Sequence, residues 1–419
     1  MKKNVVLIAG SCVPVPSATG SIAIKYAEYL SKKCGFNVSI VCMQEENNKY
    51  FGKNVNDVRY FCLSNFRLNR FQIHFRKAKK TKGIVCFYHN VALFFYRAVG
   101  KVVSTFFAYT NSGWFVHKAY RTLKYINKNF EHIDVVVSFN SPIEAHLVAI
   151  RYNKHFGCPF IAYMFDSIPS KGNLLNIFVT KKRLIKVEKQ IISKSEKCMV
   201  TEELYAEMKQ RLDRTLLDSK IIETKYCLNQ LILSKQKQND SVLQLSKCLY
   251  YGSLYKDIRN PEYMLRFFDR VEHLSLKMYV TGNCDELIKK ANHYGKSIEL
   301  FATVPFVDIV DNAIDSDILI NIENNGTCSK PSKLFELISF GKPVLSFCKG
   351  ERGFDYYGQV CNVNENKPVA ENIRIVNSFL HNFKKTFTKD FLERMYPERI
   401  ELNYQTILSK IIDSLDTTF

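Results

Sequence analysis

The sequence opens with the apolar run Val5-Val6-Leu7-Ile8-Ala9, followed by the small-residue loop Gly10-Ser11-Cys12-Val13-Pro14-Val15-Pro16-Ser17-Ala18-Thr19-Gly20. A short continuous apolar run is typical of a parallel strand that is buried on both faces. A predicted helix follows, with apolar residues on one face at Ile22, Ala23, Tyr26, Ala27 and Leu30. A second strand, Val38 to Cys42, comes next. This is the order of a right-handed βαβ unit, which places the loop at the carboxyl edge of a parallel sheet, where ligands bind.

The length of 419 residues exceeds what a single hydrophobic core usually supports, so two domains are expected. The thirteen cysteines contain no CxxC pair and no Cys/His cluster with metal-ligand spacing. Reduced thiols in a cytoplasmic protein are the simplest interpretation. The apolar run at the start is too short for the core of a signal peptide, so no export signal is expected.

The strand and helix alternation continues through the first domain, which we place at residues 1–215. Further strands are predicted at 134–139, 160–165 and 198–201, with a helix at 184–192. Asp166 follows directly after one of these strands, where a doubly wound sheet presents polar groups to its cleft, although a structural cap would look the same.

A second series of strands and helices follows the polar segment 216–246, which we interpret as the crossing between domains. Five strands are predicted, at 248–251, 276–281, 298–301, 317–322 and 343–347, with helices at 261–271, 285–293, 308–313 and 331–340. The alternation predicts a second parallel sheet in a domain spanning 246–385. Residues 386–419 are expected to end in a helix that packs back on the first domain.

The sharpest local signal is Cys328-Ser329-Lys330-Pro331-Ser332-Lys333-Leu334-Phe335-Glu336-Leu337-Ile338-Ser339-Phe340-Gly341-Lys342-Pro343-Val344-Leu345. Pro331 near its start and Gly341 just past its end set the limits of a predicted helix in this stretch. The free amides and the positive dipole end at the start of a helix attract phosphate, and Ser332 and Lys333 add a hydroxyl and a cation there. Glu336, one turn further on, could accept hydrogen bonds from both hydroxyls of a ribose. The alternative is that Lys333 and Glu336 form an ordinary surface pair on an amphipathic helix.

A second constellation favours the binding interpretation. In Tyr250-Tyr251-Gly252-Ser253-Leu254-Tyr255-Lys256-Asp257-Ile258-Arg259-Asn260-Pro261-Glu262 a strand ends near a glycine, and a basic loop leads to the next helix. Gly252 permits close backbone approach of a ligand, and Arg259 offers a planar fork for diphosphate oxygens.

These two stretches, together with Val304-Pro305-Phe306 and Asp315-Ser316-Asp317-Ile318-Leu319-Ile320-Asn321, resemble the nucleotide-sugar domain of GT-B glycosyltransferases, particularly the large, mostly retaining family 4. The resemblance is to the pattern "psKlfEyiasGkPil". It implies an α/β GT-B fold, two Rossmann-like domains facing each other across a cleft. It also implies that Glu336 holds the donor ribose and that Lys333 and Arg259 neutralise the donor diphosphate. The chain departs from the family at its first glutamate, where Cys328 stands, with Glu323 a possible substitute five residues earlier.

The implied chemistry needs fixed positive charge. When a nucleoside diphosphate departs, negative charge collects on phosphate while the sugar becomes oxocarbenium-like, so a cation favours the transition state. We therefore expect Lys333, Arg259 and Asp166 as catalytic residues, and Gly252, Ser253, Ser332, Lys333 and Glu336 as donor-binding residues. The nucleotide-sugar is a substrate, so no cofactor and no metal are expected. Asp315-Ser316-Asp317 precedes its strand and is interpreted as a turn rather than a metal motif.

The net charge of +20 is concentrated in one segment, residues 58–130, which holds fourteen Lys and Arg residues and no acidic residue. Its aromatic residues suggest contact with an anionic membrane surface, since its longest uncharged run, 102–117, is too short and polar to cross a bilayer. A solvated basic face is the alternative. Nucleic-acid binding is disfavoured, because aromatics in runs such as Ala92-Leu93-Phe94-Phe95-Tyr96 are expected to be buried rather than available for base stacking.

The sequence thus predicts a bacterial-type enzyme of the cytoplasm or the inner membrane face. It would transfer a hexosyl group from a nucleotide-sugar to a glycan or lipid-linked acceptor during surface polysaccharide synthesis. Two alternatives remain open at this point: another nucleotide-sugar enzyme of the same fold, such as a 2-epimerase, and a non-catalytic basic protein that binds membrane or nucleic acid. Acceptor groups would come from the first domain, where the candidates are Asp166 and the histidines His74, His89, His117 and His146.

Overall fold

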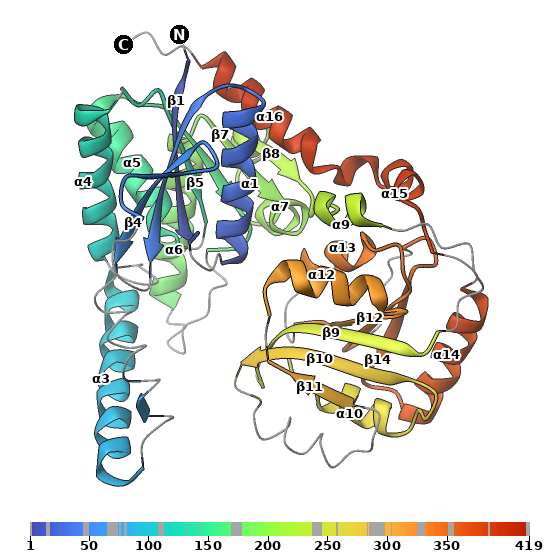
Figure 1. Cartoon of the computed structure of the whole chain (residues 1–419). Coiled ribbons are helices and arrows are strands. Elements are labelled where there is room, and N and C mark those ends of the chain that lie inside the picture. Colours follow the sequence, from blue (N-terminus) through green and yellow to red (C-terminus); the bar gives the residue numbers. More distant parts are fainter. Residues whose placement is uncertain are drawn as a thin grey trace. The chain divides into compact units, whose positions relative to one another are not determined.

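The structure is a computed structural model (Figure 1). It describes residues 2–13, 17–44, 50–64, 74, 77–78, 82–107, 113–130, 132–140, 142–168, 178–236, 245–256, 259–282, 284, 298–302, 304–324, 332–350, 356–383 and 386–415. The chain divides into two compact units, one comprising Met1–Thr224 with Tyr404–Phe419, and the other comprising Lys225–Asn403. Each unit has its own sheet and its own core.

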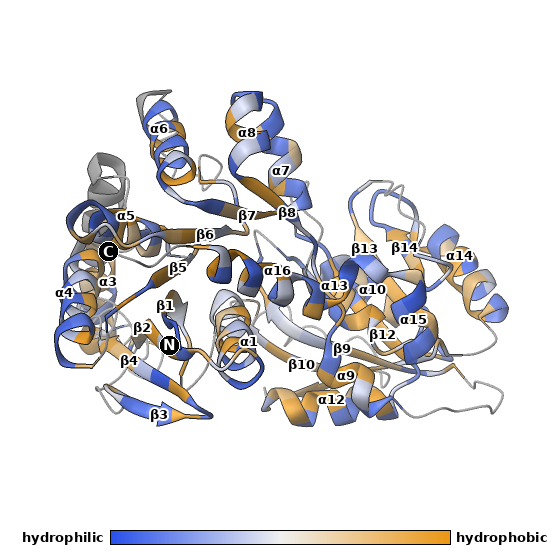
Figure 2. Cartoon of the chain, turned by 90° about the horizontal axis from the view of Figure 1, so that it is seen from above, coloured by the Kyte–Doolittle hydropathy of each residue, from blue (hydrophilic) through white to orange (hydrophobic). Residues whose placement is uncertain are grey.

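The first unit is built on an eight-stranded sheet in the order β3-β4-β2-β1-β5-β6-β7-β8. All pairs are parallel except β3 with β4 at one edge. The strands are β1 (Asn4–Ser11), β2 (Asn37–Gln44), β3 (Lys53–Val55), β4 (Val58–Ser64), β5 (Val135–Phe139), β6 (Phe160–Met164), β7 (Lys197–Thr201) and β8 (Ile221–Thr224). The central strands are apolar along their length because helices cover them, as the colouring of β5 and β6 illustrates (Figure 2).

Helices of the first unit supply the other half of its core. They are α1 (Ala18–Lys32), α3 (Gly83–Phe107), α4 (Gly113–Asn129), α5 (Glu144–Phe156), α6 (Phe178–Lys194), α7 (Glu202–Lys209) and α8 (Arg214–Lys220). Helix α4, for example, buries Phe115, Ala119 and Leu123 against the sheet and turns its basic residues outward. That division is the ordinary behaviour of an amphipathic helix.

The start of α1 packs closely against the end of β1. Ser17 is the N-cap, and its Oγ accepts a hydrogen bond from the Gly20 amide. A Cβ at Gly20 would lie 1.9 Å from the Ser11 carbonyl oxygen, so only glycine lets the helix approach the strand end this closely. The predicted glycine-bearing loop is therefore explained, at Gly20, by helix packing.

The second unit is built on a six-stranded parallel sheet in the order β11-β10-β9-β12-β13-β14. Its strands are β9 (Lys247–Leu254), β10 (Ser275–Gly282), β11 (Ile298–Phe301), β12 (Ile318–Ile322), β13 (Val344–Cys348) and β14 (Val360–Asn364). The chain runs outward from β9 to β11 on one side and from β12 to β14 on the other. The strand order therefore reverses between β9 and β12, which is the position where open α/β sheets bind ligands.

The helices of the second unit are α9 (Gln230–Lys235), α10 (Glu262–Asp269), α12 (Phe306–Asp315), α13 (Ser332–Ile338), α14 (Val369–Asn382) and α15 (Lys389–Met395), with a 3₁₀ turn at Pro397–Arg399. Two apolar clusters lie on the two faces of the sheet. The five predicted strands of this half are all present, and β14 is an additional one. The predicted helix at 285–293 lies outside the described residues.

The segment 216–246, expected to be a polar crossing, contains ordered elements of both units. Strand β8 completes the first sheet, and α9 packs Ile232 and Leu233 into a core of the second unit. The last helix, α16 (Glu401–Ser414), reaches the first unit, where Lys3 Nζ donates to the carbonyls of Ile412 and Leu415 at 2.7 and 2.8 Å.

The expectation that the aromatics of 92–96 are buried is wrong for two of them. The side chains of Phe94 and Phe95 are 68% and 62% exposed, while Leu93 is buried. A helix that packs one stripe leaves its other stripes outside whatever their hydropathy, and here the outer stripe is aromatic.

Candidate functional site

The candidate site forms at the carboxyl edge of the second sheet, where the strand order reverses. Gly252 and Ser253 lie at the end of β9, and Asn324 lies two residues after β12. Arg259, on the loop after β9, donates from Nη2 to Asn324 Oδ1 at 2.9 Å and from Nη1 to the Ser253 carbonyl at 3.5 Å. One guanidinium thus joins the two strands on either side of the reversal.

Lys333, on the first turn of α13, brings its ammonium group to the same place. Its Nζ is buried, has no hydrogen-bond partner among the described residues, and lies 3.7 Å from the ring centroid of Tyr251 and 4.9 Å from that of Tyr250. Ring faces attract a cation but satisfy none of its three N–H donors. The ammonium group therefore keeps its capacity to bind an anionic ligand.

Gly252 is what allows Lys333 to lie there. The glycine has φ +138°, and a Cβ at this position would be 2.8 Å from Lys333 Nζ and 3.9 Å from Arg259 Nη1. An L side chain is strained in that conformation, and its Cβ would force the ammonium group to shift. The glycine therefore creates the space in which the two cations approach one another.

Glu336, one turn further along α13, is held by a strand residue. Tyr251 Oη donates a hydrogen bond of 2.7 Å to Glu336 Oε1. The tyrosine is buried, and burial together with the carboxylate raises its pKa well above the ordinary value, so it remains a donor at neutral pH. The second carboxylate oxygen of Glu336 is not part of this bond.

Burial also sets the charge state of Lys333. Desolvation lowers the pKa of its ammonium group to about 7, Glu336 opposes that shift, and Arg259 adds to it. Near neutral pH this lysine is therefore poised between its neutral and charged forms, and an anion beside it would favour the charged form.

The rest of the sequence motif stabilises the domain. Lys342 Nζ donates to the carbonyl oxygens of Ala313, Ile314 and Ser316, the last turn of α12 and its C-cap. A Cβ at Gly341 would lie 1.9 Å from the Phe387 carbonyl oxygen. The Gly-Lys-Pro end of the motif is thus explained by helix capping and close packing, not by ligand binding.

The structure brings together Gly252, Ser253, Arg259, Lys333 and Glu336 of the predicted set. Ser332 begins α13, but its side chain, like Cys328, lies outside the described residues. Asp166 belongs to the first unit, where it is exposed after β6 and accepts a bond of 2.8 Å from Asn140 Nδ2 at its backbone oxygen. Sequence reasoning missed the roles of Tyr251 and Asn324, because a strand tyrosine and a loop asparagine carry no pattern.

The predicted turn at Asp315-Ser316-Asp317 is confirmed. Helix α12 ends at Asp315, Ser316 is its C-cap, and Asp317 Oδ2 accepts from the backbone amides of Ser246 and Lys247 at 3.1 and 2.8 Å. Within the described part of the chain, no three His, Cys, Asp or Glu side chains are arranged to hold a metal ion.

The histidines of the first unit lie in structural settings. His146 is buried on α5 and shares a hydrogen bond of 2.8 Å between its Nδ1 and Ser138 Oγ. The Nδ1 atoms of His74 and His89 are 2.9 Å apart. His117 is exposed on α4.

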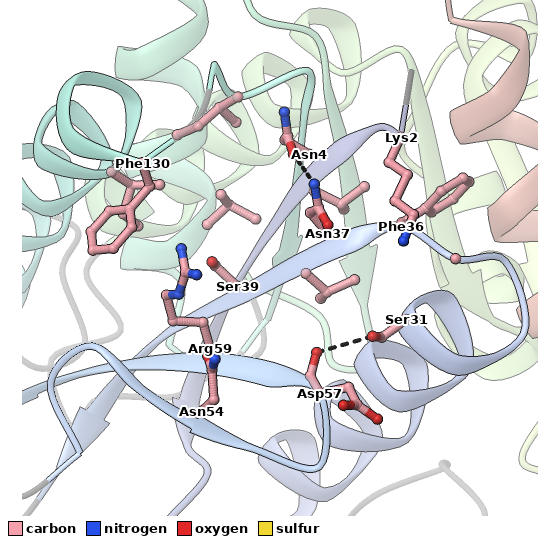
Figure 3. Close-up of a pocket in the computed structure, with 16 residues that line it drawn as sticks. Lys2, Asn4, Ser31, Phe36, Asn37, Ser39, Asn54, Asp57, Arg59 and Phe130 are labelled. Carbon is pink, nitrogen blue, oxygen red and sulfur yellow. Dashed lines mark hydrogen bonds between the residues drawn. The ribbon is translucent and has the colours of Figure 1, made fainter.

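Two hollows lie at the opposite, amino edges of the sheets. The one in Figure 3 has a volume of about 390 Å³ and is bordered by Asn4, Asn37 and Arg59 at the starts of β1, β2 and β4. The other, of about 750 Å³, lies beside Lys247, Asp317 and Lys342 in the second unit. Neither includes a predicted site residue, and amino edges are not where such sheets bind ligands.

Comparison with known proteins places the chain by fold. No protein-family model and no curated protein matches its sequence. Among solved structures, it is similar to sucrose-phosphate synthase from Thermosynechococcus elongatus, with TM-score 0.67, 10% identity and 98% of each chain covered. It is also similar to Anabaena HepE in complex with UDP and glucose, with TM-score 0.60, 10% identity, and 99% of this chain and 100% of that one covered.

A third similar structure is WaaG, a glycosyltransferase involved in lipopolysaccharide biosynthesis, with TM-score 0.53, 11% identity, and 99% and 96% of the two chains covered. These likenesses extend over both units. The chain has the two-domain GT-B fold of Rossmann-like units that its sequence predicts.

Proposed function

We propose that this GT-B protein is a glycosyltransferase that takes a sugar from a nucleotide-sugar donor bound at the carboxyl edge of its second sheet. The observation that carries the proposal is the buried ammonium group of Lys333, unpaired among the described residues and beside the Arg259 guanidinium. Burying two neighbouring cations away from water costs free energy unless an anion neutralises their charge. A diphosphate carries the charge that this arrangement lacks.

Glu336 fits the sugar of the nucleoside. Its Oε1 already accepts from Tyr251, which orients the carboxylate, and a carboxylate can accept further bonds from a ribose diol. Because Glu336 lies one turn beyond Lys333 on α13, diphosphate and ribose would be served by one helix. The similar structures of HepE contain UDP with glucose and UDP-glucose, which supports a nucleotide-sugar as the donor class.

The proposed mechanism rests on charge. As the glycosidic bond to the diphosphate breaks, negative charge grows on the leaving oxygens, and Lys333 and Arg259 stabilise it more in the transition state than in the ground state. The donor's charge raises the pKa of Lys333, so the ammonium form is present when the bond breaks. Metal-independent transfer of a hexosyl group with retention of configuration is the finer proposal, drawn from the sequence resemblance.

The acceptor is proposed to be a glycan or lipid-linked glycan of bacterial surface polysaccharide synthesis, since WaaG and the lipopolysaccharide galactosyltransferase WaaB have the same fold. Asp166 is the proposed acceptor-side residue, because it follows β6 at the carboxyl edge of the first sheet.

Calorimetry with UDP-, GDP- and CMP-linked sugars tests the proposal. We expect one of them to bind to the wild type and to lose at least tenfold in affinity with Lys333→Met. The matched control, Lys247→Met, removes an exposed lysine at the opposite, amino edge of the same sheet and should bind normally. If none of the donors binds, the proposal is overturned. If the protein converts a bound donor to its 2-epimer without an acceptor, the assigned reaction becomes epimerisation instead of sugar transfer.

A further inference from the structure

Helix α3 of the first unit presents an apolar stripe to its surroundings. Ile84 is 87% exposed, Phe87 70%, Tyr88 61%, Phe94 68% and Phe95 62%. With Val91, these positions recur at steps of three and four, which places them along one face of the helix. Single exposed apolar residues are ordinary, but a continuous row of aromatic ones marks an interaction surface.

The stripe is the outer face of the helix. His89 and Leu93 on the opposite side are buried, and His89 contacts His74. Among the described residues, none of the exposed stripe side chains belongs to the apolar cluster that forms the core of the first unit. Figure 1 shows α3 extending past the carboxyl end of β4. The exposed stripe is therefore not needed to fill that core.

The segment of the chain that contains the stripe carries charge of one sign. Residues 83–96 carry no Lys, Arg, Asp or Glu, and Lys82 and Arg97 stand at the two ends of this run. The next helix, α4, exposes Lys118, Arg121, Lys124 and Lys128 on its outer face. No acidic residue occurs from 58 to 130 that could neutralise them. The partner of this surface must be apolar in part and negatively charged.

We propose that α3 docks on an anionic lipid bilayer, with the stripe from Ile84 to Phe95 immersed at the level of the headgroups and the first methylene groups. No helix among the described residues is long and apolar enough to cross a membrane. A helix with an aromatic face and cationic flanks instead lies in the interface plane, where rings enter the acyl boundary and Lys and Arg meet lipid phosphates.

Two other occupants fit less well. A second copy of the chain would bring together two identical segments that are each basic and, from 58 to 130, without an acidic residue, which is repulsive. A single-stranded nucleic acid binds where aromatics and cations alternate in a groove, whereas this stripe is an uninterrupted apolar row on a convex helix. A bilayer with anionic headgroups satisfies both the apolar row and the charge.

The inference adds a partner to the proposed transferase, but it does not depend on the transfer reaction. A docked α3 would hold the first unit at the lipid surface, where a lipid-linked acceptor is found. The test therefore measures membrane binding alone, with donor binding as a separate readout.

Vesicle flotation of the full chain provides the first measurement. Binding to phosphatidylcholine vesicles with 30% phosphatidylglycerol should exceed binding to pure phosphatidylcholine by at least tenfold, and it should weaken as salt is raised from 0.1 to 0.5 M. The triple variant Phe87→Ser, Phe94→Ser, Phe95→Ser should lose at least tenfold. The control Leu231→Ser, Tyr357→Ser, Leu402→Ser removes three exposed apolar residues elsewhere and should float like the wild type.

A fluorescence experiment shows whether the stripe itself enters the lipid. The chain has one tryptophan, Trp114, so Trp114→Phe with Phe94→Trp gives a single probe on the stripe. Its emission should shift to the blue with anionic vesicles and be quenched by brominated acyl chains. Unchanged emission, or equal flotation of the triple variant, overturns the proposal. A lipid-free dimer that the triple variant dissociates would assign the stripe to a second copy, and competition by poly(U) RNA but not by vesicles would assign it to nucleic acid.

Discussion

The hydroxyl of Tyr251 and the carboxylate of Glu336 are joined by a hydrogen bond of 2.7 Å. It connects the end of β9 to helix α13, so a residue buried in the sheet fixes the orientation of a side chain at the candidate site. The same tyrosine ring lies 3.7 Å beneath the ammonium group of Lys333. One strand residue therefore positions both the carboxylate and the cation proposed to bind the donor.

Replacing Tyr251 with Phe should weaken donor binding while the fold persists. The ring and its contact with Lys333 remain, but Glu336 loses the donor that orients it, so we expect a three- to tenfold rise in the donor KM with a smaller change in kcat. Loss of a hydrogen bond to a charged group should cost about 2 kcal/mol of unfolding free energy.

Tyr279→Phe is the matched control for this variant. Tyr279 lies on the neighbouring strand β10, and its hydroxyl donates to Asn312 Oδ1 at 3.0 Å on α12. It should lose some stability but keep the donor KM. If both variants alter the KM equally, Tyr251 has no positioning role.

Removing the carboxylate of Glu336 should affect donor binding in two ways. Glu336→Gln loses the charge that raises the pKa of Lys333, so that pKa falls below about 7 and the amine is more often neutral at pH 7.5. It also loses an acceptor for the ribose. We expect calorimetry to show donor affinity at least tenfold weaker, whereas Glu371→Gln, which breaks the Lys367–Glu371 pair at the start of α14, should bind normally.

The pKa of Lys333 predicts a pH dependence of donor binding with a definite sign. With a pKa of about 7, well below the ordinary lysine value of 10.5, the free protein holds the charged form below pH 7 and loses it as the pH rises. A nucleotide-sugar has a diphosphate diester of constant charge between pH 6 and 9, so its titration does not interfere. Affinity should therefore decrease as the pH rises from 6 to 9, and Lys333→Met should abolish that dependence. An equal slope in the variant would assign the titration to another group.

Gly252→Ala tests whether Lys333 needs the space that glycine leaves. The new Cβ would lie 2.8 Å from Lys333 Nζ, and φ +138° is unfavourable for alanine, so the ammonium group must shift. Strain of this kind costs about 1–3 kcal/mol. Gly358, which precedes β14, also has a positive φ, +72°, and no atom within 4 Å of an added Cβ, so Gly358→Ala shares the left-handed backbone without the clash. Donor affinity should fall at least tenfold for Gly252→Ala and less than twofold for the control.

The sequence predicts the sheets well because apolar strands that alternate with amphipathic helices leave few other arrangements. It predicts less of what depends on tertiary contact. Strand β14 is short and half polar, and the two helices and the strand within 214–235 have a composition typical of a linker. Phe94 and Phe95 were expected inside because hydropathy alone does not say which stripe of a helix is covered.

The candidate site divides in the same way. Gly252, Arg259, Lys333 and Glu336 could be predicted because glycines and charges at strand and helix ends form recognisable patterns. Tyr251 and Asn324 could not, because each acts through a partner more than sixty residues away along the chain. The sequence also does not separate the binding residues of the motif from its structural ones, and Lys342 is an example of a motif residue whose contacts are structural.

Lys342→Met should therefore destabilise the second unit without weakening donor binding. Its ammonium group satisfies three carbonyls at the end of α12, and leaving them unpaired should lower the unfolding free energy by about 3 kcal/mol. Donor affinity should change less than twofold, because Lys342 lies at the amino edge of the sheet, away from Gly252 and Lys333. Lys389→Met, which removes an exposed lysine near the same edge, should cost less than about 0.5 kcal/mol. A tenfold loss of donor affinity in a folded Lys342→Met protein would show that this lysine has a role in donor binding.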